Sequence, residues 1–379
     1  MSKVFYLCNY VDSEYMGNLV SFPSAFGKIE YVTETLKKLG YEVDVVSLAR
    51  SAKKRFDKTE KIIDESEKHI YLSSFSSGGP LLKKVSVVFH WVEILYFLLK
   101  NVKREDKVIV YHSLDCRFWI YCYKKIFKKD FILQIEDVYT SVDKNIEHLK
   151  KKEWGIFALT DKHICVNDIL CEQLNSKHSV ISYGNYMVPK ELVSKKSKGI
   201  KLVYAGVIEQ KRKAAFVAVE SMRFLDEEYE LHILGFGEKE NIDALKILID
   251  EFNMRYEKHR IFFYGEKRGT EYFEFLQNCD IGLSTHSYHE DDMESADHTF
   301  PSKILTYMSN GLRVVAQELN VLKKSAIAEG MTFYKEPTPE EIAKAIMSVD
   351  LNDGYDSREI IKKLNEKFKQ NLNELLEVL

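Results

Sequence analysis

Short, wholly apolar runs alternate along this chain with polar loops and amphipathic segments, and this alternation constrains the fold more than any other feature. Residues 4–7 form the first apolar run, and a polar loop follows it. Ile29, Val32 and Leu36 then recur at helical spacing, before a second apolar run at residues 41–47. A strand, a helix and a second strand in this order favour parallel pairing within one sheet.

The same rhythm extends along the chain and restarts once. Further strands in the first part are expected at residues 68–72, 107–111, 131–135, 162–166 and 179–182. A polar, Lys/Ser-rich stretch at residues 190–199 is the expected linker. Beyond it, strands that alternate with helices are expected at residues 201–204, 229–234, 261–264, 281–284 and 314–316. The sequence therefore predicts an α/β protein with two open parallel sheets, in domains over residues 1–189 and 200–355.

Charge is distributed unevenly between these two parts. The 379 residues carry a net charge of −3, which argues against a dedicated nucleic-acid binder. Residues 1–190 sum to +5 and residues 191–379 to −8. Two halves of opposite sign indicate two domains that meet different partners.

The cysteines and the apolar runs bear on the compartment. The six cysteines form no Cys-x-x-Cys pair and no zinc-like spacing, so reduced thiols in a cytoplasmic protein are expected. The first apolar run lacks the basic segment and the cleavage site of a signal peptide. The longest apolar stretch, residues 85–99, contains His90 and Glu93 and is shorter than the roughly 20 residues needed to cross a bilayer.

Cations follow the first strand of the second half, at the end of the sheet where open α/β proteins bind ligands. Gly206 leads into a loop, and Lys211 and Arg212 stand just before the next helix. A small residue, a helix N-terminus and several cations together favour a phosphate site. A solvated basic turn is the alternative interpretation.

Glycines end the next two strands. Gly235 and Gly237 allow a ligand to approach the backbone closely, and Gly265 ends the following strand in the same manner. Glu240 stands where a dinucleotide-binding fingerprint has its third glycine, so that fingerprint is excluded.

The most informative segment is residues 300–316. Pro301 and Ser302 open a helix there, and Lys303 lies in its first turn. A lysine at a helix start opposes the helix dipole unless an anion is bound, so Lys303 is interpreted as a phosphate ligand rather than as a plain surface lysine.

Taken in order, these motifs resemble the nucleotide-sugar-binding domain of glycosyltransferases with the GT-B fold, near glycosyltransferase family 4 and related enzymes that assemble bacterial surface glycans. The matching segments are the Gly loop with its two cations, the Leu-Gly-x-Gly turn, Phe-Tyr-Gly, Asn-Cys-Asp-Ile-Gly-Leu, and the stretch Pro-Ser-Lys-x-x-x-Tyr-Met-x-x-Gly-Leu-x-Val-Val. The resemblance covers residues 201–351. The first half is similar in architecture and in the loop-helix start at residues 23–29.

The resemblance implies two Rossmann-like domains that face a cleft, with the helix at residues 356–379 packed back on the first domain. It implies a nucleoside-diphosphate-sugar donor, a UDP-sugar above others, with retention of configuration, no metal and no further cofactor. The donor-binding residues that it implies are Gly206, Lys211, Arg212, Gly235, Gly237, Gly265, Pro301, Ser302, Lys303 and Thr306. The family's acidic pair falls on His298 and Thr306, neither of which is acidic, with Asp297 or Glu294 as alternatives.

Strand ends in the first half supply acceptor-side candidates. His112, Glu136 and Asp137 follow two of the expected strands and could orient or deprotonate an acceptor hydroxyl, so they are the candidate catalytic residues. A structural histidine and helix-capping carboxylates are the alternatives. Asn9, Gly17 and Gly27 are expected in the acceptor-side loop.

Two apolar, cation-bearing stretches bear on further partners. Residues 119–129 mix aromatic side chains with four lysines, and residues 81–99 form a long apolar helix. Together they could dock on an anionic membrane that carries a lipid-linked acceptor. A core helix with a solvated basic end is the alternative.

We therefore expect a glycosyltransferase that moves a sugar from a nucleotide donor to a glycan or lipid-linked acceptor in bacterial polysaccharide or glycoconjugate synthesis, in the cytoplasm or at the inner face of the membrane. Two other classes remain open at this stage. One is a nucleotide-sugar epimerase with the same fold, and the other is a non-catalytic module that binds nucleotide sugar or glycan.

Overall fold

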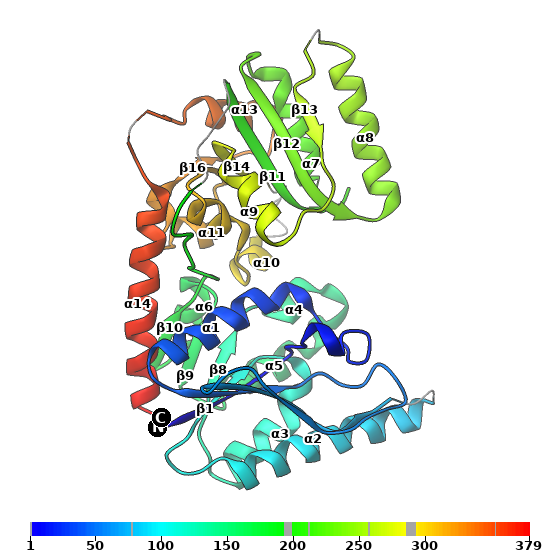
Figure 1. Cartoon of the computed structure of the whole chain (residues 1–379), viewed down its shortest axis with the longest axis vertical. Coiled ribbons are helices and arrows are strands. Elements are labelled where there is room, and N and C mark those ends of the chain that lie inside the picture. Colours follow the sequence, from blue (N-terminus) through cyan, green and yellow to red (C-terminus); the bar gives the residue numbers. More distant parts are fainter. Residues whose placement is uncertain are drawn as a thin grey trace. The chain divides into compact units, whose positions relative to one another are not determined.

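The computed structural model describes residues 2–76, 79–192, 199–210, 213–256, 258–285, 293–352 and 354–379. The chain divides into two compact units (Figure 1). Unit 1 contains residues 1–185 and 367–379, and unit 2 contains residues 186–366. No helix in these ranges is both long enough and apolar enough to cross a membrane.

Unit 1 is built on an eight-stranded sheet with the order β10-β9-β8-β7-β1-β2-β5-β4. All neighbours pair in parallel except β4, which runs antiparallel to β5 at the edge. The strands are β1 (Lys3–Cys8), β2 (Glu42–Ser47), β4 (Thr59–Ile62), β5 (Glu67–Tyr71), β7 (Lys107–Tyr111), β8 (Ile132–Ile135), β9 (Lys162–Cys165) and β10 (His178–Ile181). Two further strands, β3 (Arg55–Phe56) and β6 (Ser74–Phe75), flank β4 and β5 in the sequence and form a small antiparallel pair of their own.

Helices cover both faces of this sheet, and Figure 1 shows α1 and α2 on opposite sides of it. The helices are α1 (Phe26–Lys38), α2 (Pro80–Asn101), α3 (Arg117–Tyr121) continued by the π-helical turn η4 (Cys122–Ile126), α4 (Tyr139–Val142), α5 (Lys150–Phe157) and α6 (Asp168–Leu174). The 3-10 turns are η1 (Ser13–Tyr15), η2 (Pro23–Ala25), η3 (Leu114–Cys116) and η5 (Lys144–Leu149). The second half of α14 (Ser357–Glu377) also belongs to unit 1, where the ring of Phe368 packs 5.5 Å from that of Tyr31.

Unit 2 is built on a six-stranded, wholly parallel sheet with the order β13-β12-β11-β14-β15-β16. The strands are β11 (Ile200–Ile208), β12 (Tyr229–Gly237), β13 (Ile261–Phe263), β14 (Ile281–Ser284), β15 (Arg313–Gln317) and β16 (Met331–Tyr334). The helices are α7 (Ala214–Ser221), α8 (Lys239–Asn253), α9 (Gly269–Gln277), α10 (Met293–Asp297), α11 (Lys303–Ser309), α12 (Asn320–Lys323) and α13 (Pro339–Met347), with 3-10 turns η6 (Met222–Phe224) and η8 (Ala328–Gly330).

Each sheet has a point at which the strand order reverses, between β1 and β7 in unit 1 and between β11 and β14 in unit 2. Loops that leave the carboxyl ends of the strands diverge at such a point and leave room for a ligand. The predicted fold class, α/β with two Rossmann-like parallel sheets, is therefore confirmed.

The local differences from the sequence prediction have physical reasons. Strand β5 was predicted, at residues 68–72, whereas β3, β4 and β6 were not, since β3 and β6 have two residues each and β4 is a half-exposed edge strand with the polar sequence Thr-Glu-Lys-Ile. Helix α1 begins at Phe26, three residues earlier than predicted, because Pro23 already sets a helical turn in η2. Gly27, predicted to lie in the loop, is therefore an exposed residue of the helix.

Packing of α11 on the sheet of unit 2 depends on a missing side chain. A Cβ at Gly282, in β14, would collide with the ring of Tyr307. That ring is fully buried, and its hydroxyl accepts a 2.8 Å hydrogen bond from the backbone amide of Ala205. Gly282 thus lets α11, which begins at Lys303, lie directly on the sheet.

We expect Gly282→Ala to destabilise unit 2 by about 1–3 kcal/mol, because the added methyl group must displace a buried aromatic ring. Urea denaturation measures this as a lower midpoint. Gly27→Ala is the matched control, since a Cβ there meets no atom within 4 Å and a helical alanine is favoured over glycine. A midpoint for Gly282→Ala equal to or above that of the wild type would contradict this packing.

Candidate functional site

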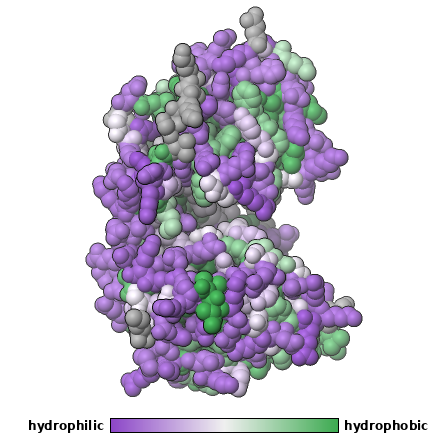
Figure 2. Space-filling view, in the orientation of Figure 1, coloured by the Kyte–Doolittle hydropathy of each residue, from purple (hydrophilic) through white to green (hydrophobic). Residues whose placement is uncertain are grey.

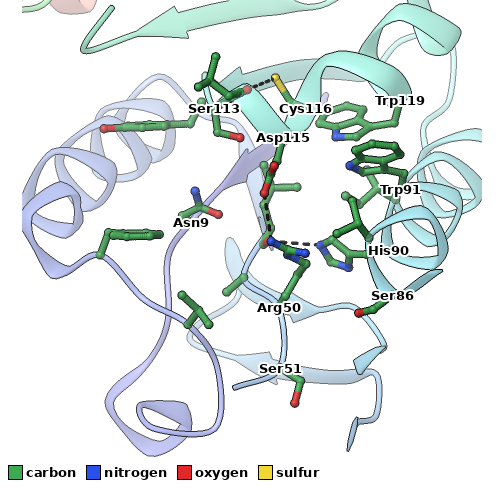
Figure 3. A pocket seen from close by; sticks show the side chains of 18 of the residues that line it. Asn9, Arg50, Ser51, Ser86, His90, Trp91, Ser113, Asp115, Cys116 and Trp119 are labelled. Atoms are coloured by element: carbon green, nitrogen blue, oxygen red, sulfur yellow. Dashed lines mark hydrogen bonds and ion pairs between the residues drawn. The ribbon is translucent and has the colours of Figure 1, made fainter. Parts of the chain in front are cut away.

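A cavity of about 790 Å³ lies at the strand-order reversal of unit 1 (Figure 3). Its floor comes from the carboxyl ends of four parallel strands, and one wall comes from α2. Six aromatic side chains line it, namely Phe22, Phe75, Trp91, Tyr111, Trp119 and Tyr139. Largely apolar walls with a few polar groups are typical of sites that bind small organic ligands.

Some of the polar side chains that line this cavity already pair with other groups of the protein. Arg50 Nη2 lies 3.2 Å from a carboxylate oxygen of Asp115, and Figure 3 shows the two side chains pointing toward one another. His90 Nε2 lies 3.2 Å from the carbonyl oxygen of Leu48. Asn9 also lines the cavity, as predicted for the acceptor-side loop. Both a cation and an amide are thus presented to a ligand.

Asp137 is the predicted catalytic residue that lines the cavity. None of the described residues hydrogen-bonds its carboxylate. Burial, together with the neighbouring charge of Glu136, raises the pKa of Asp137 to about 6. A half-buried carboxylate that accepts no hydrogen bond from the described residues and has a pKa of about 6 is suited to accept a proton from a ligand hydroxyl.

Glu136, the adjacent carboxylate, is fully engaged. It pairs with Lys28 of α1, Nζ to Oε2 at 2.5 Å, and accepts a 2.7 Å hydrogen bond from Gln134. Lys28 also donates to the backbone carbonyl of Ser182, and Tyr6 donates to Gln134 at 2.7 Å. This network connects α1 to β1, to β8 and to the residue that follows β10. It also fixes Glu136, the residue that precedes Asp137.

His112 is buried and is not among the residues that line the cavity. Its Nε2 lies 2.9 Å from a carboxylate oxygen of Glu153, and burial lowers the pKa of the imidazole. Glu153 in turn accepts bonds from the backbone amides of Tyr139 and Thr140 and from the hydroxyl of Thr140. His112 therefore helps to fix the loop that carries Asp137 and Tyr139, and its catalytic role stays a prediction.

Gly17 and Gly27, predicted beside Asn9, do not line the cavity. Gly17 occupies an exposed turn with φ of +80°, a conformation that favours glycine. The carbonyl of Gly27 accepts a 3.2 Å hydrogen bond from Asn185.

In unit 2 the predicted donor residues gather at the carboxyl ends of β11, β12 and β13. Gly206 pairs in register with Gly235, whose amide donates a 2.9 Å bond to the carbonyl of Gly265. Lys303 reaches this row, since its Nζ lies 4.3 Å from the centre of the Tyr204 ring and 3.1 Å from the place of a Cβ on Gly206. A surface without side chains thus lies beside an ammonium group.

The packing of β12 against β11 also explains why Gly235 and Gly237 are glycines. A Cβ at Gly235 would collide with the carbonyl oxygen of Gly206, and one at Gly237 with that of Ile208. The close approach of two strands therefore requires them independently of any ligand. Gly265 has φ of +71° and no atom within 4 Å of an added Cβ, so its backbone conformation alone favours glycine.

The remaining predicted residues surround α11. Pro301 and Ser302 precede the helix, and the side chain of Ser302 makes no capping bond. Thr306 is half-buried on the first turns. His298 is buried, and burial raises the pKa of Asp297.

For three of the predicted residues, the position of the side chain is not described. Lys211 and Arg212 lie outside the described residues, and the side chain of Glu294 does also.

Sequence reasoning missed several residues of these sites. Arg50 follows β2 and could have been found by the rule that strand ends carry ligands. His90 and Trp91 come from the middle of α2, where no local signal marks them. In unit 2, Thr285 ends β14 and donates a 2.7 Å bond to the carbonyl of Ala214, which joins the strand end to the start of α7. Within the described ranges, no group of three metal-ligating side chains gathers in a way that could hold a metal ion.

Similar folds occur among solved structures, and three illustrate the range. An E. coli trehalose-6-phosphate structure bound with UDP-2-fluoro glucose has a TM-score of 0.63 at 9% identity, covering 100% of this chain and 98% of that one. A UDP-forming alpha,alpha-trehalose-phosphate synthase from Burkholderia xenovorans, in complex with glucose-6-phosphate, has a TM-score of 0.64 at 8% identity, with 99% and 98% coverage. A glycosyltransferase from Rickettsia africae ESF-5 has a TM-score of 0.62 at 15% identity, with 99% and 96% coverage. This likeness defines the GT-B class of fold.

The sequence of unit 2 is similar to a known family. Residues 199–350 match the family model described as "Glycosyl transferases group 1". Over these residues the chain is similar to group 1 glycosyltransferases, and its fold is of the GT-B class. No curated protein matches the chain.

Asp137 should lower the stability of unit 1 at neutral pH. A buried acid whose pKa is raised to about 6 binds more protons in the folded than in the unfolded state, so stability falls as pH rises between about 4 and 6. We expect Asp137→Asn to raise the unfolding free energy by roughly 1–3 kcal/mol at pH 8 and by little at pH 4. Urea denaturation at the two pH values measures the difference. Glu65→Gln, at an exposed site in the same unit, is the control and should show no such pH dependence.

Proposed function

We propose that this protein transfers a sugar from a nucleoside-diphosphate-sugar donor, a UDP-sugar above others, to a glycan or lipid-linked acceptor. In this proposal unit 2 binds the donor, and the cavity of unit 1 binds the acceptor. The setting that we propose is bacterial polysaccharide or glycoconjugate synthesis, at the inner face of the membrane.

The observation that carries the donor assignment is the row of Gly206, Gly235 and Gly265 beside the ammonium group of Lys303. Backbone free of side chains admits a diphosphate closely, and Lys303 would offset the charge that develops on it as the leaving group departs. The UDP-2-fluoro glucose bound by the E. coli neighbour supports a UDP-sugar donor.

The acceptor assignment is supported by the chemistry of the cavity in unit 1. Aromatic walls suit the apolar faces of sugar rings or the first part of a lipid chain, and Arg50 suits an anionic group on the acceptor. The glucose-6-phosphate in the Burkholderia xenovorans neighbour is a sugar phosphate of that kind.

In the reaction, a bond forms between an acceptor hydroxyl oxygen and the anomeric carbon, and the bond from that carbon to the diphosphate breaks, so that the diphosphate leaves with the bonding electrons. The hydroxyl proton passes to the carboxylate of Asp137. Asp137 orients the acceptor hydroxyl by accepting its hydrogen bond. Glu136 and His112 act as positioning residues, since each holds the loop that carries Asp137. Retention of configuration is part of the proposal and rests on the family resemblance alone.

Donor binding is tested by thermal shift and turnover with Lys303→Gln. UDP at 100 times its Kd should stabilise the wild type by about 2.7 kcal/mol and raise its melting temperature. Because the variant lacks the cation beside the glycine row, we expect a smaller shift and a turnover lower by about 10²–10³-fold. Lys239→Gln is the matched control, since Lys239 also begins a helix, α8, but is exposed.

The outcomes separate the three functional classes. No shift with any nucleoside diphosphate would contradict the donor site. A shift without transfer to any acceptor would favour a binding module, and a change in donor configuration without an acceptor would favour an epimerase.

Acceptor activation is tested by the pH dependence of kcat. With Asp137 at a pKa of about 6, activity should rise as pH increases through 6, since the deprotonated form accepts the hydrogen bond. Asp137→Asn should remove this rise and lower kcat by about 10²–10⁴-fold, while the UDP-induced thermal shift stays unchanged. A variant with wild-type kcat would remove Asp137 from the mechanism.

A further inference from the structure

The face of α2 that points away from the cavity is apolar and exposed. Six of its residues recur at spacings of three or four and share one face, namely Leu81, Val85, Val88, Val92, Tyr96 and Leu99. We call them the α2 stripe. Leu81 is 73% exposed, Val92 56% and Tyr96 59%. In Figure 2, green side chains lie at the lower right, where Figure 1 places α2.

The other face of α2 is already occupied. Ser86, His90 and Ile94 are buried there and line the cavity of unit 1. Apolar side chains therefore lie on the exposed face of α2 as well as on the covered face, and only the covered face packs against the protein. An exposed apolar face of a helix marks an interaction surface.

The α2 stripe continues onto the neighbouring helix. The ring of Trp91 stacks on that of Phe118, with centres 5.3 Å apart, which fixes α3 beside α2. Beyond Phe118, this second helix exposes Tyr121, Ile126 and Phe127. Contiguous apolar surface of this extent marks an interaction site.

The charge around this surface is mainly positive. Five exposed or half-exposed lysines of these elements make no ion pair with any described residue, namely Lys84, Lys100, Lys125, Lys128 and Lys129. Residues 80–130 contain eleven Lys and Arg against five Asp and Glu, a net charge of +6. The partner of this surface should therefore be apolar and anionic together.

We propose that the α2 stripe and the exposed residues of α3 and η4 dock on the surface of an anionic lipid bilayer. Apolar side chains enter the boundary between headgroups and acyl chains, and the lysines contact the anionic headgroups. A second copy of this chain fits less well, because a two-fold interface would bring the same cations together.

This docking gives the cavity of unit 1 a use, because the same helix would contact the bilayer with one face and the acceptor with the other. The docking proposal rests on the proposed function only where it assigns the acceptor to this cavity. Vesicle binding needs neither donor nor acceptor, so failure of docking and failure of sugar transfer are distinguishable.

Co-sedimentation with vesicles tests the proposal. We expect the full chain to bind vesicles of phosphatidylglycerol and phosphatidylcholine at least tenfold better than phosphatidylcholine alone, and to dissociate at high salt. The double variant V88D/V92D places two carboxylates in the α2 stripe and should lower binding at least tenfold. The double variant K125Q/K129Q should lower binding to the anionic vesicles and reduce its salt dependence.

Ile247→Asp is the matched control, because Ile247 is an exposed apolar residue, 60% exposed, on α8 of unit 2. This variant should bind vesicles as the wild type does. The melting temperature without ligand, measured on the same samples, should be equal in all variants and reports that they are folded. A wild type that stays in the supernatant, or a V88D/V92D variant that binds normally, overturns the proposal. A wild-type dimer that V88D/V92D dissociates also overturns it and assigns the surface to a second copy.

Discussion

Parallel strand pairing is the constraint on which both sites depend. Because all strands of a parallel set point the same way, the backbone amides and side chains that follow them collect at one edge of the sheet. At the reversal between β1 and β7 this brings Asn9 and Asp137 to one cavity, although 127 residues lie between them in the sequence. At the carboxyl edge of the second sheet it aligns Gly206 with Gly235, and Gly282 admits the helix that carries Lys303.

Buried carboxylates in unit 1 divide into those that stabilise and one that is left available. Glu136 and Glu153 have their oxygens satisfied by a lysine, a histidine, amides and a hydroxyl. Such saturation compensates the cost of removing charge from water. Asp137 accepts no hydrogen bond from the described residues, and the nearby charge of Lys28 offsets only part of the effect of burial on its pKa. The burial of Asp137 lowers the free energy of unfolding but leaves its carboxylate available to a ligand hydroxyl. The rigid neighbouring elements keep this side chain in place.

Most of the fold could be predicted from the sequence, because buried parallel strands such as residues 107–111 are apolar without interruption and their ends are marked by Gly or polar residues. Gly206, Gly235 and Gly265 could be located for the same reason, whereas Lys303 was singled out by its place in the first turn of a helix. The wall of the cavity could not be predicted, since His90 and Trp91 lie within a helix that has apolar side chains on both its buried and its exposed face, and periodicity does not show which face meets the sheet. The edge strand β4 was missed because three of its four side chains are polar and none of the four is fully buried.

Residues 367–379 complete the core of unit 1, where Phe368, Leu372 and Leu376 are buried. A ribosome must therefore synthesise all of unit 2 before unit 1 obtains its last helix. During that time the surface that Phe368 will cover, including the ring of Tyr31, is open to water or to a chaperone. Unit 2 has no such dependence, since its residues are contiguous. The order of synthesis thus favours a nascent chain in which the second unit closes its core before the first.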